Sequence, residues 1–389
     1  MSTARFKVAS LFCGCGGSDL GTIGGFNYLG NEYQRLPFDI VYAVDFDKPA
    51  VMTYNHNFEI PAVCADVCCI DPQKDIPDID VLIGGFPCQS FSTVNPTKDT
   101  NDERANLYKQ VVRVLHEKKP KLFVCENVKG LMTLEKGALV AKVTDAFRAE
   151  GYHVEYRLLN AANFGVPQRR ERVIIVGVRN DLFGRVQYSY PTETNDEKTW
   201  VPIKKIVKDL AAVPERYFFS QRAVEGMKNA KPNMKRGLWQ DLNGPCLTLT
   251  SHLAKVSINS RDPILLVDPK KELYRRFTPR EAAGIQSFPD DFEFNGPESK
   301  SYKQIGNAVP PVLMWHVMHQ AAKALGGVVP VNTTIKRVRA PRVEQMLLAV
   351  ERKKARMTAK QKAKGFGGKK LTVKRPAKKS PQAKGTRKR

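Results

Sequence analysis

The chain has 389 residues, of which 42% are hydrophobic and 26% are charged, so it can bury a large core and we expect two domains with appendages. No apolar run approaches the ~18–20 residues of a membrane-spanning helix, and the first residues lack the apolar core of a signal peptide. These properties argue against the membrane and secreted classes and predict a cytoplasmic protein. In that reducing compartment we expect the eight cysteines to be thiols rather than disulfide bonds.

The basic charge is concentrated at the C-terminal end. Residues 336–389 carry 21 Lys and Arg residues against Glu344 and Glu351, a net charge of +19, whereas residues 1–335 carry only +5. A polycationic tail indicates a polyanionic partner, most simply nucleic acid. The alternative interpretation is an extension that only keeps the protein in solution.

Strand-like apolar runs alternate with helical patterns in the first half of the chain. Helical spacing occurs at residues 103–117, where Leu107, Val111 and Leu115 share a face, and again at 136–149. Such alternation predicts a mostly parallel, doubly wound α/β sheet. The strands are expected at residues 7–12, 40–44, 61–65, 81–86, 121–126 and 172–178.

The alternation stops after residue 185. Residues 186–270 contain more Pro, Asn and aromatic residues, a composition that is typical of a smaller and less regular domain. Residues 308–327 predict a helix, with Pro310 and Pro311 near its start and a pair of glycines at its end. Beyond it we expect a short amphipathic helix around residues 343–350 and disorder after about Gly365.

The first three strand ends indicate a cofactor site, because ligands of an open α/β sheet bind beyond the carboxyl ends of its strands. A turn with Gly14, Gly16 and Gly17 follows the first strand, Asp45 follows the second and Asp66 follows the third. Glycines let a ligand approach the backbone, one acid can accept ribose hydroxyls, and the other can accept the adenine edge. The combination predicts a cofactor that contains adenosine.

The glycine turn departs from the dinucleotide-binding fingerprint, because Asp19 stands where the third glycine belongs. A carboxylate at that place disfavours a pyrophosphate but is compatible with a sulfonium cation. We therefore expect S-adenosylmethionine rather than a nicotinamide dinucleotide.

The next strand ends carry reactive side chains. Pro87, Cys88 and Gln89 follow the fourth strand, Glu126 and Asn127 end the fifth, and the run QRRER precedes the sixth. A thiolate can attack an electron-poor ring, a protonated carboxyl group can donate to a ring nitrogen, and an arginine can hold a ring carbonyl. Each group also has an ordinary explanation, as a buried filler, a helix-start residue or a solvated charge. Their joint position at one edge of the sheet favours a site.

With these residues in place, the sequence resembles the DNA (cytosine-5) methyltransferase family over residues 7–327. The motifs occur in the order of the family: SLFCGCGG (10–17), GGFPCQSFS (84–92), DERANLY (102–108), ENV (126–128), QRRER (168–172), REAAGIQSFP (280–289) and QIGNAVPP (304–311). One of them alone would be a weak indication. The ordered set, with a variable stretch between QRRER and REAAGIQ, is highly specific.

The resemblance implies a reaction and a catalytic group. Cys88 would add to C6 of a cytosine flipped out of the duplex, and the methyl group of S-adenosylmethionine would then be transferred to C5, which leaves S-adenosylhomocysteine. Glu126 would bind the N3 and amino edge of the ring, and Arg172 would hold its O2. Arg170 would support this catalytic group.

The resemblance also implies residues for the cofactor, for the loops and for DNA. For the cofactor these are Phe12, which would stack on adenine, Gly14, Gly16, Gly17, Asp45, Asp66 and Asn307; for the loops and the substrate they are Pro87, Gln89, Ser92, Arg104, Asn127, Thr248 and Thr250. Residues 89–104 would form a mobile loop that closes over DNA, and LTLT (247–250) would be the Thr-Leu signature of the recognition domain. Two positions depart from the family: Ser10 replaces the Asp of the first motif, and Asp45 replaces the more common Glu.

These roles imply four parts: a catalytic and cofactor-binding domain (1–185), a target-recognition domain (186–275), a segment that returns to the catalytic domain (276–330) and a basic tail (331–389). The expected partner is double-stranded DNA, bound by a monomer without a membrane. A cognate restriction endonuclease would be a functional partner rather than a physical one. The enzyme would then lie in the cytoplasm of a bacterium or a phage-infected host, associated with the nucleoid through DNA.

Several alternatives stay open at this point. The substrate can be RNA instead of DNA, the protein can bind a flipped base without turnover, or it can be a nicotinamide-dependent oxidoreductase. We expect no metal site, because the cysteine spacings match no usual zinc pattern. The tail is expected to add non-specific DNA affinity, and the recognition sequence is not predicted.

Overall fold

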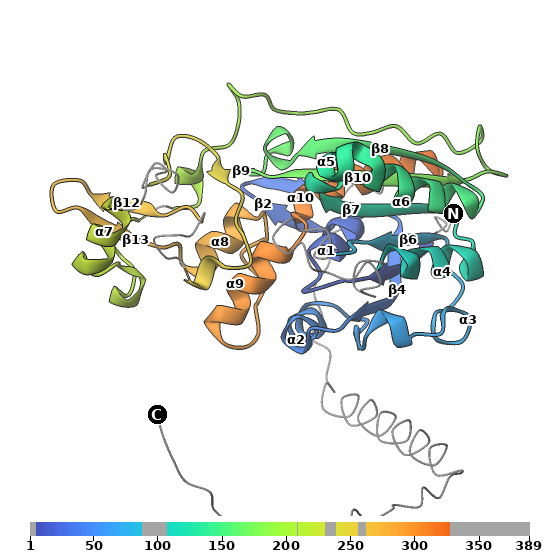
Figure 1. The fold of residues 1–389 in the computed structure, drawn as a ribbon, viewed down its shortest axis with the longest axis horizontal. Helices are drawn as coiled ribbons and strands as arrows, with labels where there is room; N and C mark the ends of the chain where they lie inside the picture. Colours follow the sequence, from blue (N-terminus) through green and yellow to red (C-terminus); the bar gives the residue numbers. More distant parts are fainter. Residues whose placement is uncertain (1–4, 88–106, 208, 230–238, 256–261, 327–389) are drawn as a thin grey trace, which may run out of the picture. The chain divides into compact units, whose positions relative to one another are not determined.

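The computed structural model describes residues 5–87, 107–207, 209–229, 239–255 and 262–326 (Figure 1). By its internal contacts the chain divides into two units, residues 1–340 and 341–389, and every described residue belongs to the first. The amphipathic helix and the disorder that we expect in the basic tail lie outside the described residues.

The central sheet of the described chain has seven strands in the order β5-β4-β1-β6-β7-β10-β8. Their bounds are β1 Phe6–Leu11, β4 Phe38–Asp45, β5 Val63–Cys64, β6 Val81–Gly84, β7 Leu122–Val128, β8 Tyr152–Asn160 and β10 Glu171–Arg179. The strands from β5 to β7 pair in parallel, and β10 runs antiparallel to both of its neighbours. The predicted mostly parallel α/β sheet is therefore confirmed.

Helices cover both faces of this sheet (Figure 1). Val8 and Ile83 belong to a core that includes residues of α1 (Gly17–Ile23) and α10 (Pro311–Ala324). Their neighbours Ala9 and Leu82 belong to the core beneath α4 (Tyr108–Lys118) and α6 (Ala138–Ala149). Successive residues of one strand thus bury opposite faces, which is the doubly wound arrangement predicted from the apolar runs.

The reversed direction of β10 decides where the site forms. Because β10 is antiparallel, its first residues lie at the same edge as the last residues of β6 and β7. The edge strand β8 and the hairpin of β2 (Phe26–Tyr28) and β3 (Asn31–Tyr33) are additional to the strands that the apolar runs predicted.

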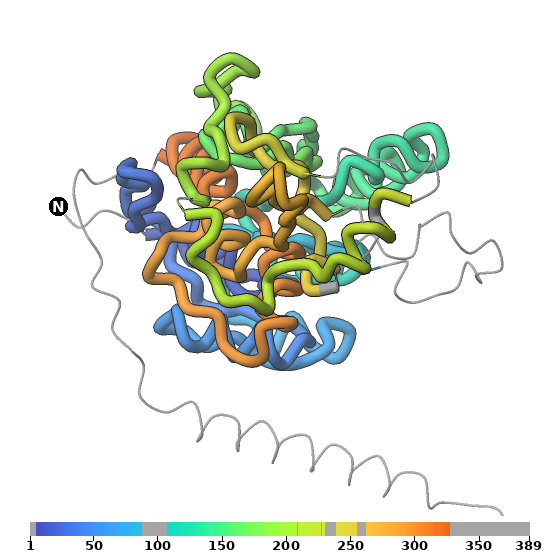
Figure 2. Tube along the Cα trace, turned by 90° about the vertical axis from the view of Figure 1, so that its left-hand side faces the viewer, coloured from blue at the N-terminus to red at the C-terminus, as the bar shows by residue number. Residues whose placement is uncertain are grey.

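The remaining elements follow β10. They are α7 (Gln221–Lys228), β11 (Cys246–Leu247), β12 (Leu265–Asp268), β13 (Leu273–Arg275), α8 (Pro279–Ile285) and α9 (Glu298–Asn307). Val224, Ile264 and Tyr274 form a small core of their own here. In Figure 1 α7, β12 and β13 lie together beside α8 and α9, and Figure 2 views the molecule from that end. The domain bounds at residues 186 and 275 stay a prediction.

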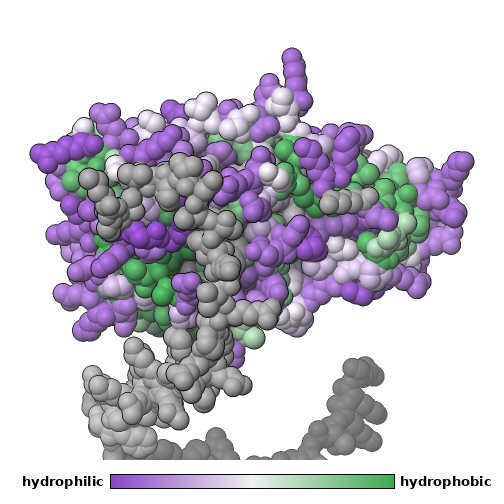
Figure 3. All heavy atoms as spheres, turned by 180° about the vertical axis from the view of Figure 1, so that it is seen from behind, coloured by the Kyte–Doolittle hydropathy of each residue, from purple (hydrophilic) through white to green (hydrophobic). Residues whose placement is uncertain are grey.

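The other α-helices of the described chain are α2 (Lys48–Asn57), between β4 and β5, and the one-turn helices α3 (Pro72–Asp75) and α5 (Gly130–Thr133). Hydrophilic residues cover most of the face in Figure 3, with hydrophobic residues in smaller areas between them. Among the helices of the described chain, none combines the length and the apolarity that a bilayer crossing requires.

Candidate active site

Glu126 and Arg172 form an ion pair at the sheet edge where β7 ends and β10 begins. The ladder pairs Glu126 with Ile174 and Arg172 with Val128, so both side chains leave the same face of the sheet. Arg172 Nε lies 2.8 Å from Glu126 Oε1, and the two side chains are only 10% and 15% exposed. The arginine thus holds its charge in a largely buried place, next to a carboxylate.

The environment of Arg172 leaves donors for a ligand. Burial lowers the pKa of Arg172, and the nearby Glu126 opposes this shift. Its Nη1 donates to the carbonyl of Glu171 at 2.7 Å and its Nε faces Glu126 at 2.8 Å, whereas its Nη2 forms no hydrogen bond with a described residue. A planar group with a carbonyl and ring nitrogens could therefore engage the pair.

Asn127 ties the end of β7 to the segment that follows β6. Its Nδ2 donates to the carbonyl of Phe86 at 2.9 Å, and its Oδ1 accepts from the backbone of Val128 at 2.9 Å. A methyl group added to Gly85 would lie 3.3 Å from Glu126 Oε2. The backbone before Pro87 therefore runs directly beside the carboxylate of Glu126.

Four of the predicted site residues lie outside the described residues: Cys88, Gln89, Ser92 and Arg104. Pro87 is described and precedes Cys88 in the chain. The structure therefore gives the position at which this segment leaves the sheet and does not test the role of the thiol.

Arg170 is buried beneath the site, and its contacts are backbone carbonyls. Only 2% of the residue is exposed, and its guanidinium donates to the carbonyls of Leu249 (3.0 Å), Gly306 (2.9 Å) and Ala308 (2.9 Å). Burial lowers the pKa of Arg170 well below its usual range. These contacts fit the supporting role that was predicted for it.

Two buried glutamines extend these contacts into a network. Gln168 Nε2 donates to Gln286 Oε1 at 2.5 Å, and Gln168 Oε1 accepts from the backbone of Leu249 at 3.0 Å. Gln286 Nε2 in turn donates to the carbonyl of Ala308 at 2.5 Å. We call Gln168, Arg170 and Gln286 the Arg170 network; it joins the start of β10 to the LTLT segment and to the end of α9.

The threonines of the LTLT segment are held on either side of this network. Thr248 Oγ1 donates to the carbonyl of Arg169 at 2.7 Å, and Thr250 Oγ1 donates to Asp262 Oδ1 at 2.7 Å. A methyl group on Gly306 would meet the Thr250 carbonyl oxygen at 2.1 Å. The recognition segment and the end of α9 are therefore in direct backbone contact.

The predicted cofactor residues gather at the carboxyl ends of β1, β4 and β5. Gly14 donates its backbone N–H to Asp45 Oδ2 at 2.9 Å, and Asp47 donates to Asp45 Oδ1 at 2.8 Å. Burial raises the pKa of Asp45, and the two backbone donors oppose this. Phe12 adopts a left-handed φ of 57°, and Asp66 is exposed while its carboxylate accepts from the backbone of Cys68.

Asn307 is exposed at the end of α9, and two contacts hold this helix against the loop after β4. Lys303 Nζ lies 2.5 Å from Asp47 Oδ2, and Gln304 Nε2 donates to the carbonyl of Pro49 at 3.2 Å. These contacts hold α9 against the loop that follows Asp45, and the cofactor role of Asn307 stays a prediction.

Gly16 and Gly17 provide the close packing beneath the glycine turn. A methyl group on Gly16, which has a φ of 95°, would lie 2.2 Å from the ring of Phe58, and one on Gly17 would lie 2.5 Å from the carbonyl oxygen of Val309. These glycines are needed for packing against the protein itself as well as for the approach of a ligand.

Asp19 has a different environment from the one that the sequence suggested. It is fully buried and accepts hydrogen bonds from Ser10 (3.0 Å), Ser18 (3.2 Å) and Tyr54 (2.9 Å). Burial raises its pKa to about 6, although the three hydroxyl donors act in the opposite direction. The carboxyl group of Asp19 therefore holds the start of α1 through hydrogen bonds to other residues of the protein, rather than facing a ligand.

Phe46 is a candidate that the sequence reasoning missed. It directly follows Asp45 and is 70% exposed, which is a high exposure for an aromatic residue. Its place next to an acid at a strand end suits a side chain that stacks on a bound ring. The signal was present in the sequence as an aromatic residue between two acids, Asp45 and Asp47, just beyond an apolar strand.

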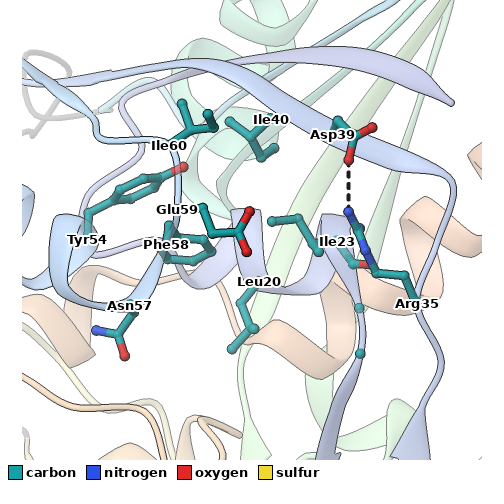
Figure 4. Close-up of a pocket in the computed structure, with 12 residues that line it drawn as sticks. Leu20, Ile23, Arg35, Asp39, Ile40, Tyr54, Asn57, Phe58, Glu59 and Ile60 are labelled. Carbon is teal, nitrogen blue, oxygen red and sulfur yellow. Dashed lines mark hydrogen bonds and ion pairs between the residues drawn. The ribbon is translucent and has the colours of Figure 1, made fainter. Parts of the chain in front are cut away.

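A small cavity of about 140 Å³ lies elsewhere, between α1, α2 and the first residues of β4. Figure 4 shows apolar side chains such as Leu20 and Ile40 around it, with the ion pair of Arg35 and Asp39 (2.9 Å) at one side. Because it opens near the amino end of β4, it lies away from Asp45 and is not the candidate cofactor site. Among the described residues, no group of three or more His, Cys, Asp and Glu side chains could hold a metal ion.

The recognition region keeps several of its polar side chains in internal contacts. Lys228 pairs with Glu272 at 2.6 Å, and Gln240 Oε1 accepts from the backbone of Leu247 at 3.0 Å. Arg222 on α7 is exposed. Within the described chain, exposed side chains such as Arg222 are therefore better placed to contact DNA than those already paired.

Comparisons with known proteins identify the family of the chain. The family model described as C-5 cytosine-specific DNA methylase matches residues 6–323. Type II methyltransferase M.BspRI of Lysinibacillus sphaericus is 37% identical over 346 residues, which cover 79% of this chain and 80% of the relative. Type II methyltransferase M.NgoFVII of Neisseria gonorrhoeae is 35% identical, with 80% and 84% covered.

The fold is also similar to solved structures. The crystal structure of the S. pombe Dnmt2 methyltransferase superposes with a TM-score of 0.63 at 21% identity and covers 82% of this chain and 99% of its own. The sheet thus has the Rossmann-like fold of this methyltransferase. Together with the family match, these findings establish that the chain belongs to the C-5 cytosine-specific DNA methylase family and is a DNA (cytosine-5)-methyltransferase.

Proposed function

We propose that the enzyme methylates C5 of a cytosine that is flipped out of a specific sequence in duplex DNA, through a covalent bond between Cys88 and C6. The observation that carries this proposal is the Glu126–Arg172 pair, held by the β7–β10 ladder beside the segment that leads to Cys88. Family membership supports the cytosine and the DNA.

Each residue of the pair has a distinct part in the reaction. The Cys88 thiolate adds its sulfur to C6, which places negative charge on the ring. Glu126 binds the N3 and amino edge, and Arg172 donates to O2, so that the charge develops against fixed partners in a largely water-free place. After C5 has gained the methyl group, the C5 proton leaves, the bond from sulfur to C6 breaks, and the thiolate is free again.

The cofactor residues fit S-adenosylmethionine, which when bound supplies a methyl group on a sulfonium. The exposed ring of Phe46 and the left-handed Phe12 lie at the edge where an adenine would stack. Asp45 has each of its oxygens engaged by one backbone N–H, and each keeps a lone pair for a ribose hydroxyl. The exposed Asp66 and Asn307 complete the site.

The DNA is read by the part of the chain after β10. Residues 186–275 act as the target-recognition domain. Thr248 ties its LTLT segment to the carbonyl of Arg169 in the catalytic domain, and Thr250 fixes the same segment internally through Asp262. The relatives named as Type II methyltransferases support a role in restriction-modification, in which the enzyme protects DNA sites from a cognate nuclease.

The test is methyl transfer from labelled S-adenosylmethionine to duplex DNA, with tRNA as the alternative acceptor. We expect label in the DNA with the wild type, no label with Cys88→Ser, and a trapped protein–DNA adduct when the DNA contains 5-fluorocytosine, because fluorine does not leave as a proton does. Cys69→Ser is the matched control, since this exposed cysteine has no assigned part.

The outcomes separate the alternatives. Label in tRNA but not in DNA would overturn the proposed substrate, and transfer that survives Cys88→Ser would overturn the covalent mechanism. Bisulfite sequencing of DNA modified by the wild type then identifies the methylated cytosine and the sequence around it.

A further inference from the structure

A hollow of about 440 Å³ adjoins the catalytic pair on the side away from β6. Arg172 lines this hollow and also contacts Glu126, so the surface continues from the site at which the cytosine is proposed to bind. We call it the Arg169 hollow; its lining residues that enter the argument are Lys129, Arg169, Glu171, Arg172, Glu197 and Trp200.

Arg169 is oriented by an aromatic platform. Its guanidinium lies over the ring of Trp200, 5.5 Å from the ring centroid. The ring is fixed in turn, because Trp200 Nε1 donates to Asn163 Oδ1 at 2.7 Å and Asn163 Nδ2 donates to Glu193 Oε1 at 2.7 Å. An arginine stacked in this way keeps the N–H groups at its edges free to donate.

The backbone of Arg169 is fixed as well. Its carbonyl accepts from Thr248 at 2.7 Å, and β9 (Gln168–Arg169) pairs in parallel with β11. The exposed side chain is therefore presented from a rigid place, on the same short strand that supplies Gln168 to the Arg170 network.

The carboxylates that pair within the hollow leave the guanidinium of Arg169 without an acidic partner. Lys129 pairs with Glu171 at 2.9 Å and Arg172 pairs with Glu126 at 2.8 Å. The Arg169 guanidinium forms no hydrogen bond or ion pair with another described residue. Glu197 is the acid of the hollow that forms no ion pair with a described residue, and it would repel an anion.

We propose that the Arg169 hollow binds a backbone phosphate of the DNA strand that carries the target cytosine, with Arg169 as the donor and Trp200 as the platform that orients it. The proposal rests on the proposed function insofar as DNA is the substrate. A phosphate fits because a guanidinium matches it with two parallel hydrogen bonds, and because more than half of the hydrogen bonds between proteins and DNA go to phosphate and sugar.

The test is the salt dependence of DNA binding, with affinities measured for the proposed target duplex and for an unrelated duplex of equal length. Neutralising one phosphate contact changes the slope of log K against log [salt] by about 0.9. For Arg169→Gln we expect a slope that is less steep by that amount and an affinity reduced roughly tenfold on both duplexes. Arg169→Lys should keep the slope, because a lysine still neutralises a phosphate as a point charge.

Two further variants sharpen the result. Glu197→Gln should raise the affinity two- to threefold, because it removes a charge that repels the phosphate. Arg185→Gln, which removes an exposed arginine outside the hollow, should leave both slope and affinity unchanged. In turnover, Arg169→Gln should raise the KM for DNA and leave kcat at saturating DNA unchanged.

Two results would overturn the proposal. If Arg169→Gln leaves the slope unchanged but alters which sequence is preferred, the arginine reads a base edge instead. If slope and affinity are both unchanged while circular dichroism shows a folded variant, the hollow does not contact DNA. A wild type that methylates no DNA would instead refute the proposed function, so the two failures are distinguishable.

Discussion

Replacing Arg170 by methionine should destabilise the protein strongly, although the residue touches no proposed ligand. Methionine keeps much of the length and fills the space, but it cannot donate to the carbonyls of Leu249, Gly306 and Ala308. The Ala308 carbonyl keeps its hydrogen bond from Gln286. The carbonyls of Leu249 and Gly306 lose the donor that the structure gives them, and Pro310, four residues beyond Gly306, has no N–H to replace it.

The size of the effect follows from these two acceptors. A buried polar group left without a partner costs about 1–3 kcal/mol, so the two carbonyls together cost about 2–6 kcal/mol. Removing the guanidinium also relieves the cost of burying its charge, which is the main cause of its lowered pKa. We therefore expect the free energy of unfolding to fall by about 2–5 kcal/mol, a large share of the ~5–15 kcal/mol that holds a typical domain folded.

The measurement is urea unfolding followed by tryptophan fluorescence, with two comparison variants. Arg170→Lys keeps a charged donor and should give an intermediate loss. Arg222→Met removes an exposed arginine of α7 that donates to no carbonyl of a described residue, and it should cost less than about 1 kcal/mol. A loss below about 1 kcal/mol for Arg170→Met would refute the reasoning, because the Arg170 network would then not support the carbonyls that it contacts.

Two further predictions concern other buried positions. Burial raises the pKa of Asp19 to about 6, so between about pH 4 and pH 6 the folded state binds a proton that the unfolded chain lacks. The stabilisation that this proton gives the folded state is therefore full below pH 3.8 and is lost as the pH rises through 6. The wild type should lose roughly 2 kcal/mol relative to Asp19→Asn between pH 4 and pH 7, and a difference that is constant with pH would contradict this. Gly306→Ala should lower the free energy of unfolding by about 1–3 kcal/mol, since its methyl group would lie 2.1 Å from the Thr250 carbonyl oxygen. Gly244→Ala is the control, because its methyl group would have room, and it should change the stability little. Equal melting temperatures for the two variants would refute the close approach of Gly306 to Thr250.

The fold was predictable to the extent that burial alone determines it. Runs such as VLIGGF are apolar because both faces of the sheet are covered, and this is visible in a single sequence. The edge strand β8 was harder, since its pattern mixes buried residues such as Tyr152 and Val154 with the exposed Glu155, Tyr156 and Arg157. The direction of β10 was not stated either, because an apolar run does not carry the direction of its pairing.

The candidate site was predictable where chemistry is local in sequence. Glu126 was singled out at the end of a strand and Arg172 through the QRRER motif of the family that the sequence resembles, and the ladder brings them together. The Arg170 network was not predicted beyond a general support, because its partners at 249, 286 and 306–308 are distant in the chain and most of its acceptors are backbone carbonyls. Backbone carbonyls are identical in every residue and leave no sequence signal.

The hydrogen bond between Ser10 and Asp19 has a consequence for the sequences that this fold can accept. The family's usual Asp at the first motif would, at position 10, bring a second carboxyl group against the buried Asp19, and two carboxylates at such a distance cannot both be ionised. The two positions are therefore epistatic: Ser10→Asp should be harmful alone and tolerated when Asp19 becomes serine. Within this chain Ser10 supplies a hydroxyl donor to the buried carboxyl group of Asp19, so serine at this place of the motif is matched to its neighbour and does not by itself indicate a weakened site.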